Sequence, residues 1–161
     1  MLPIGEYGAC RVEEGNGCIQ LVDGDGRVQM TDLPGNWETS KWLEHHARGR
    51  VLVVGGGLGL DVDVLLNCRH AERIIVTEAN PCIVEALREH YANRLEVTWA
   101  GTGGSGIHLL YRWAHTIWLD IWPEYDEASL TECRTEVERL RGLYPALIGA
   151  RLLEYERLGG G

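Results

Sequence analysis

The pattern of apolar and polar positions is clearest over residues 51–66, which read VLVVGGGLGLDVDVLL. Four consecutive apolar residues, three of them β-branched, are typical of a strand that is buried on both faces of a parallel sheet. Glycine then occupies four of the next five positions, and apolar residues with helical spacing follow. The pattern therefore predicts a strand over 51–54, a tight glycine turn and a helix over 59–68.

The same alternation of short apolar runs and helical patterns continues to residue 123. It predicts a helix over 81–91 and a short helix around 107–113, which follows a glycine-rich loop. Strands that alternate with helices imply right-handed crossovers and a parallel sheet covered by helices on both faces. We therefore predict an α/β sheet of about four parallel strands, over residues 51–54, 73–77, 95–99 and 115–121.

The two ends of the chain differ from this central part. Residues 18–22 and 27–31 flank the turn signal DGDG and predict a β-hairpin. A second turn at 32–35 would lead to a helix from Trp37 to about Arg48, capped by Asn36. After Pro123 the pattern predicts only helices, over 126–141 and 145–158. We expect an N-terminal β-hairpin extension over 1–35, one α/β domain over 36–158 and a disordered tail over 159–161.

Composition and charge narrow the classes of function. The chain of 161 residues carries 24 acidic and 15 basic side chains, a formal charge of −9. Nucleic-acid binding depends on cations placed on phosphates, so a nucleic-acid partner is disfavoured. Apolar runs stay shorter than the ~20 residues of a membrane span, and the first residues do not read as a signal peptide. We expect a cytoplasmic protein that does not contact a membrane.

Five scattered cysteines, without a C-x-x-C pair, are typical of reduced thiols rather than of a metal site. The aspartates of the DGDG turn resemble the start of a calcium loop, but Pro34 stands where the twelfth-position carboxylate is needed. We therefore predict no metal site.

The glycine turn is the strongest candidate for a binding site. A strand, a glycine turn and a helix in this order place backbone N–H groups and a helix N-terminus where a nucleotide-like ligand can bind. Glycines lack the side chain that would hold such a ligand away. Glu78 follows 19 positions after the last of them, at the tip of the second expected strand, where such folds bind ribose hydroxyls. The residues concerned are Gly55, Gly56, Gly57, Gly59 and Glu78.

Three segments together resemble a known family. DGRVQMTD (25–32), VLVVGGGLG (51–59) and ERIIVTEANPCIVEAL (72–87) are similar, in this order, to segments of the class I S-adenosylmethionine-dependent methyltransferase superfamily. Within it, they look most like the spermidine synthase branch. The resemblance covers roughly residues 18–123 and implies a Rossmann-like, methyltransferase-type sheet. It also implies S-adenosylmethionine or decarboxylated S-adenosylmethionine as the ligand.

The resemblance assigns roles to individual residues by their position. The turn from Gly55 to Gly59 would contact the methionine part and the ribose of the ligand. Glu78 would accept hydrogen bonds from both ribose hydroxyls. Gln29 would reach the amino-acid or aminopropyl end. Asp120 would be the catalytic residue, which orients the attacking nucleophile and accepts its proton.

The chain departs from that branch at three places. Leu58 replaces the aspartate of G-G-G-D-G, and the third strand ends in Trp99 without the acid that usually binds the adenine. The segment Asp120–Glu124 reads DIWPE where aminopropyl transferases have D-S-S-D-P. The kind of group transferred is therefore left open between methyl and aminopropyl.

The sequence thus predicts an S-adenosylmethionine-dependent transferase that acts on a small molecule or a protein side chain. The alternative is a non-catalytic module that binds an S-adenosyl ligand or a partner. An NAD-dependent oxidoreductase is disfavoured because the single lysine, Lys41, leaves no Tyr-x-x-x-Lys pair. A nucleic-acid methyltransferase is disfavoured by the charge. We also expect a homo-oligomer, because a sheet that ends at residue 121 would leave an apolar edge uncovered.

Overall fold

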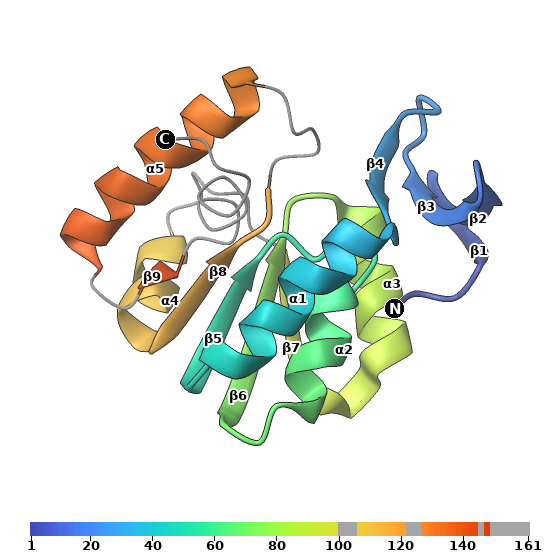
Figure 1. Ribbon diagram of the computed structural model, residues 1–161. Helices are drawn as coiled ribbons and strands as arrows, with labels where there is room; N and C mark the ends of the chain where they lie inside the picture. Colours follow the sequence, from blue (N-terminus) through green and yellow to red (C-terminus); the bar gives the residue numbers. More distant parts are fainter. Residues whose placement is uncertain (100–105, 122–126, 145–146, 149–161) are drawn as a thin grey trace.

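A computed structural model describes residues 1–99, 106–121, 127–144 and 147–148 of the chain. These residues form two sheets: a small antiparallel sheet at the N-terminus, and a parallel sheet flanked by helices (Figure 1). The α/β fold predicted from the sequence is confirmed.

The small sheet has four strands in sequence order, each antiparallel to the next. The predicted hairpin is its second half, while the first two strands were missed by the sequence analysis. Both are hard to recognise, because one has three residues and the other ends in two glutamates and a glycine. The strands are β1 (Gly5–Tyr7), β2 (Cys10–Gly15), β3 (Cys18–Val22) and β4 (Val28–Thr31).

The parallel sheet has the strand order β7-β6-β5-β8-β9. The four predicted strands are present, and the one that leads into the glycine turn lies at the centre. Beside it, the chain first runs outward through β6 and β7 and then returns to the other side as β8. The strands are β5 (Gly49–Val54), β6 (Ala71–Glu78), β7 (Glu96–Trp99), β8 (Thr116–Leu119) and β9 (Leu147–Ile148).

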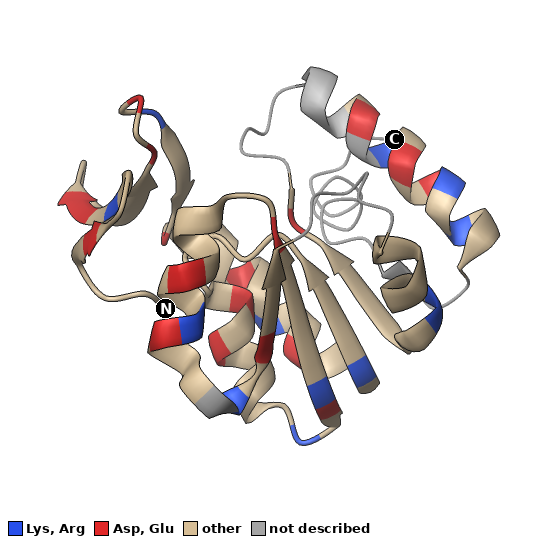
Figure 2. Ribbon diagram, turned by 180° about the vertical axis from the view of Figure 1, so that it is seen from behind, with Lys and Arg blue, Asp and Glu red and all other residues tan. Residues whose placement is uncertain are grey.

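Alternate residues of β5 face opposite layers of the core. Val51 and Val53 pack with α1, α2 and α3, whereas Leu52 and Val54 pack with α4 and α5. Figure 2 shows that charged residues gather near the ends of the strands and on the helices, so the middle of the sheet remains apolar. Among the described helices, none is long and apolar enough to cross a membrane. The helices are α1 (Pro34–His46), α2 (Leu60–Asn67), α3 (Pro81–Tyr91), α4 (Ile107–Trp113) and α5 (Glu127–Leu143), with a 3₁₀ turn at Ala92–Arg94.

The start of α1 differs from the prediction. The helix begins at Pro34 rather than at Trp37, and Leu33 occupies the N-cap position. Proline suits the first helical position, because it lacks the N–H that would be unpaired there. Asn36 is therefore inside the helix, and its amide donates hydrogen bonds back to Thr31, at 2.6 Å from the carbonyl oxygen. The predicted cap and the turn at 32–35 are both wrong.

The prediction of a helix over 145–158 is wrong at Leu147 and Ile148. These two residues form β9, which pairs in parallel with β8. Short apolar runs fit a strand as well as a helix, and pairing with an open strand edge decides in favour of the strand here. The rest of that predicted helix, the tail at 159–161 and the glycine-rich loop at 101–105 lie outside the described residues.

A buried carboxylate joins two helices to the sheet. Asp61, in the first turn of α2, is only 6% exposed. One of its oxygens accepts a hydrogen bond from the Ser40 hydroxyl of α1 at 2.6 Å, and the other accepts from the indole N–H of Trp118 in β8 at 2.7 Å. A negative charge at the N-terminal end of a helix is also stabilised by the helix dipole. Asp61 therefore fixes α1 and α2 against the strand that leads to Asp120.

We expect Asp61→Ala to lower the free energy of unfolding by about 2–4 kcal/mol, because it leaves a buried indole N–H unpaired and opens a cavity. Urea unfolding followed by circular dichroism measures this change. Asp25→Ala, in an exposed turn, is the control and should stay within about 0.5 kcal/mol of the wild type. Equal stability of the two variants would contradict the structural role of Asp61.

Candidate functional site

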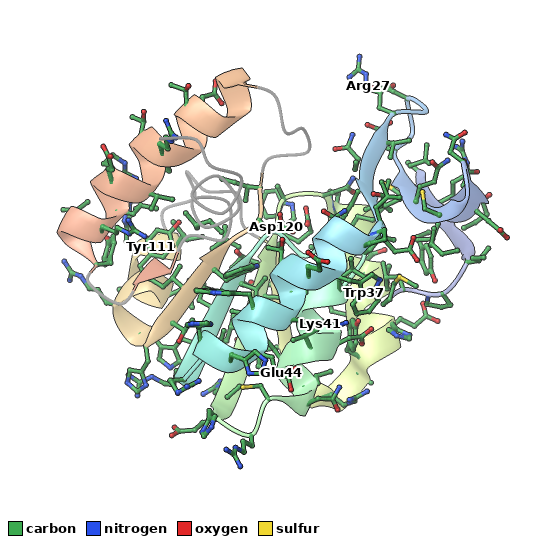
Figure 3. The ribbon with its side chains drawn as sticks, in the orientation of Figure 1. Arg27, Trp37, Lys41, Glu44, Tyr111 and Asp120 are labelled. Carbon is green, nitrogen blue, oxygen red and sulfur yellow. The ribbon has the colours of Figure 1, made fainter. Side chains whose placement is uncertain are left out.

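The carboxyl ends of β5, β6 and β8 meet at one edge of the parallel sheet. Because β6 and β8 flank β5 on opposite sides, this edge contains the point where the strand order reverses, and open α/β sheets bind ligands at such a point. The Gly55 N–H donates to the carbonyl of Thr77 at 2.8 Å, and the Asp120 N–H donates to the carbonyl of Val54 at 2.8 Å. Figure 3 shows Asp120 at this edge.

The turn after β5 requires glycine at two positions for steric reasons. Gly55 has φ of +99°, and a Cβ there would overlap the backbone carbonyl oxygen of Asp120. Gly57 has φ of +45°, and a Cβ there would overlap the sulfur of Met30. Such φ values are strained for residues with a side chain. The turn is therefore held by contacts within the protein.

Met30 connects the small sheet to this turn. Its sulfur accepts a hydrogen bond from the Leu58 N–H at 3.2 Å. Met30 pairs with the buried Leu21 in β3, which places it on the inner face of the small sheet. Sequence reasoning missed Met30, although the alternation of side chains along a strand places residues 29 and 30 on opposite faces.

Gln29, the residue expected to reach the ligand, is engaged within its own hairpin. Its amide donates to the carboxylate of Asp23 at 2.7 Å. The same carboxylate accepts the backbone N–H groups of Asp25 and Arg27, each at 2.9 Å. These bonds hold the pKa of Asp23 below its ordinary value, with the backbone bond from Arg27 as the largest cause. The role of Gln29 in ligand binding stays a prediction.

Glu78 lies beside the glycine turn, at the end of β6. One carboxylate oxygen accepts the N–H groups of Gly56 at 2.9 Å and Gly57 at 3.3 Å, and the other accepts the Asn80 N–H at 2.7 Å. The side chain is half-buried. The structure thus brings together the turn and the acid that the sequence placed 19 positions apart, and it fixes the orientation of the carboxylate.

Trp99 is a further candidate that the sequence analysis noted only for the missing acid. It ends β7 in register with Glu78, and its side chain is 65% exposed. The indole N–H donates to the carbonyl of Ala79 at 2.9 Å, which fixes the ring. An exposed aromatic face in a fixed position can stack on a nucleobase.

Two further observations concern other parts of the described residues. Within those residues, no three potential metal ligands lie close together. An open cleft, lined among others by Leu66, Arg73, Arg94 and Glu96, lies at the opposite edge, where β6 and β7 begin. It does not include any of the residues that the sequence singled out.

The chain is similar to several solved structures over most of its length. No family model and no curated protein matches the chain. Among solved structures, spermidine synthase from Thermotoga maritima is 19% identical, with a TM-score of 0.49 over 81% of this chain and 51% of that one. TYW2 from P. horikoshii in complex with MeSAdo is 15% identical, with a TM-score of 0.46 over 82% and 48%. TYW2 from M. jannaschii in complex with AdoMet is 16% identical, with a TM-score of 0.43 over 83% and 59%.

This chain spans about half the length of these three solved structures. They include proteins of the class that the sequence motifs resemble. Because all three TM-scores are below 0.5 and all three identities are below 25%, the assignment of a function rests on the geometry of the site itself.

We expect Gly55→Ala to lower the free energy of unfolding by at least about 3 kcal/mol or to prevent folding, because the methyl group would overlap the Asp120 carbonyl and φ is positive. Gly35→Ala is the control, since a Cβ there meets open space in the first turn of α1. It should leave the stability unchanged or raise it by up to about 1 kcal/mol. Thermal unfolding distinguishes the two, and wild-type stability of Gly55→Ala would contradict the described turn.

Proposed function

We propose that this chain binds an S-adenosyl compound at the carboxyl edge of its parallel sheet and transfers a methyl or aminopropyl group to a small molecule or a protein side chain. The observation that carries the proposal is the position of Glu78. Its carboxylate is held against the N–H groups of the glycine turn, next to the point where the strand order reverses. A ligand with a ribose diol fits an acceptor in this place.

The residues around Glu78 suit the other parts of such a ligand. We infer that the adenine lies against the exposed ring of Trp99, in register with Glu78. Stacking on an aromatic ring does not need the acid that most relatives of the resembled family place at the end of this strand. The sulfonium end would then point along the glycine turn toward β8 and Asp120.

In this proposal Asp120 acts on the acceptor. It is half-buried, and its backbone is fixed by the bond to Val54 and by contact with Gly55. Its carboxylate would hold an amine or hydroxyl group and accept a proton from it. A bound S-adenosyl sulfonium supplies an activated carbon and a good leaving group, so the protein mainly has to position the acceptor and exclude water.

We also propose that the chain forms a homo-oligomer. The edge of β8 that the sequence predicts to be uncovered is paired with β9, so it does not supply the contact. Exposed apolar side chains on α4 and α5, Leu109 and Leu143, still offer material for contact with a second copy.

Glu78→Ala should weaken the binding of S-adenosylhomocysteine about 30- to 150-fold, because the charge-assisted bonds to the ribose are lost. Isothermal titration calorimetry measures the dissociation constant. Glu96→Ala is the control: this glutamate lies at the opposite edge of the sheet, in an exposed pair with Arg73, and its loss should not change the affinity. The assignment fails if Glu78→Ala, verified as folded by circular dichroism, binds as tightly as the wild type.

Asp120→Asn should abolish transfer while changing the affinity for S-adenosylhomocysteine by less than about threefold. The substitution keeps the shape of the side chain and removes the charge, and a proton acceptor is worth about 10²- to 10⁴-fold in rate. The assay is release of S-adenosylhomocysteine or methylthioadenosine in a screen of amines, polyamines, small acids and peptides. Wild-type turnover by Asp120→Asn would remove its catalytic role. If no acceptor in the screen supports release of either product, the non-catalytic alternative is favoured.

A further inference from the structure

Two cysteines that are 72 positions apart in the sequence lie where the small sheet contacts α3. Cys10 begins β2 and is 2% exposed, whereas Cys82, in the first turn of α3, is partly exposed. The turn between β1 and β2 lies directly over Cys82. The Ala9 N–H points to the Cys82 sulfur at 3.5 Å, and a Cβ on Gly8 would lie 3.1 Å from the same atom.

The surroundings of Cys10 raise the pKa of its thiol. Burial is the largest cause, the hydrogen bond from Asn80 lowers the pKa by less, and the nearby Cys82 raises it further. Both cysteines are free thiols. Cys10 is therefore protonated and shielded at neutral pH, and Cys82 is the one that a reagent in solution reaches first.

Asn80 holds the two cysteine-bearing segments together. Its side-chain amide donates to the Cys10 sulfur at 3.2 Å, and its side-chain oxygen accepts the Cys82 N–H at 3.0 Å. One residue thus bridges the start of β2 and the first turn of α3.

We propose that Cys10 and Cys82 form a reversible disulfide when the protein meets a peroxide or a small disulfide such as oxidised glutathione. The disulfide would link the small sheet, which contains Met30, covalently to the parallel-sheet domain. The proposal goes beyond the function proposed above and does not depend on it, since it concerns only the two thiols and their surroundings.

With hydrogen peroxide the chemistry has two steps. The Cys82 sulfur attacks one peroxide oxygen, the O–O bond breaks, and a sulfenic acid and one water are formed. The Cys10 sulfur then attacks the Cys82 sulfur, and the sulfenic oxygen leaves as a second water. Each cysteine loses one electron and one proton, and the peroxide is reduced to two waters. With oxidised glutathione, two thiol–disulfide exchanges give the same bond and two reduced glutathione molecules.

The test uses a variant that keeps only this pair, Cys18→Ser/Cys68→Ser/Cys133→Ser, together with the wild type. Each is treated with hydrogen peroxide or oxidised glutathione and analysed by intact mass and by mapping of proteolytic peptides. We expect the loss of two hydrogens, a cross-link between the peptides that contain Cys10 and Cys82, and reversal by dithiothreitol. Closing so long a loop should raise the melting temperature by about 5–15 °C.

The matched control is the same variant with Cys10→Ser added. Treated in the same way, its Cys82 should remain a mixed disulfide with glutathione or an oxidised single sulfur, without a rise in melting temperature. The proposal is overturned if the pair variant keeps two titratable thiols, if Cys82 is modified while Cys10 stays reduced, or if the cross-link joins two molecules. If the triple variant does not fold, the peptide map of the wild type decides by the same outcomes.

Discussion

The packing of other elements against the backbone of the glycine turn fixes the geometry of the whole candidate site. The Asp120 carbonyl, just after β8, lies against Gly55, and the Met30 sulfur from β4 lies against Gly57. A Cβ on Gly59 would be 2.5 Å from the hydroxyl of Tyr91, at the end of α3. Because three segments distant in the sequence contact alternate residues of the turn, the turn cannot be widened without moving them. The same glycines that could admit a ligand are thus needed for the fold itself.

Two carboxylates near this turn have different roles. Asp61 is buried and is bonded to Ser40 and Trp118, so it holds the helices to the sheet. Glu78, at the end of β6, is half-buried and accepts hydrogen bonds from backbone N–H groups of the turn and of Asn80. Burial distinguishes the structural acid, Asp61, from the candidate ligand-binding acid, Glu78. The sequence alone does not separate their roles, because one follows the glycine turn closely and the other ends the next strand.

The sequence was sufficient where one strong pattern decided the structure. The apolar run at 51–54, the glycines after it and Pro81 together favour a strand, a tight turn and the start of a helix, so the strands, the turn and α3 could be predicted. The sequence was insufficient where contacts with residues distant in the chain decide the local structure. Leu147 and Ile148 become a strand only because β8 offers an edge, and Asn36 loses its role as a cap because Pro34 starts the helix. Likewise Met30, rather than Gln29, contacts the glycine turn. Which of the two does so depends on which face of β4 points inward.

The central claim is that an S-adenosyl ligand occupies the edge formed by the glycine turn and Glu78. Amide hydrogen exchange, followed by mass spectrometry with and without saturating S-adenosylhomocysteine, tests it most directly. Exchange should slow at residues 55–60 and 78–80, because a bound ligand shields these backbone groups and stabilises the bonds between them. NAD at the same concentration should have no such effect. Slower exchange only around the cleft at Arg73 and Arg94, or at no residue at all, would contradict the account.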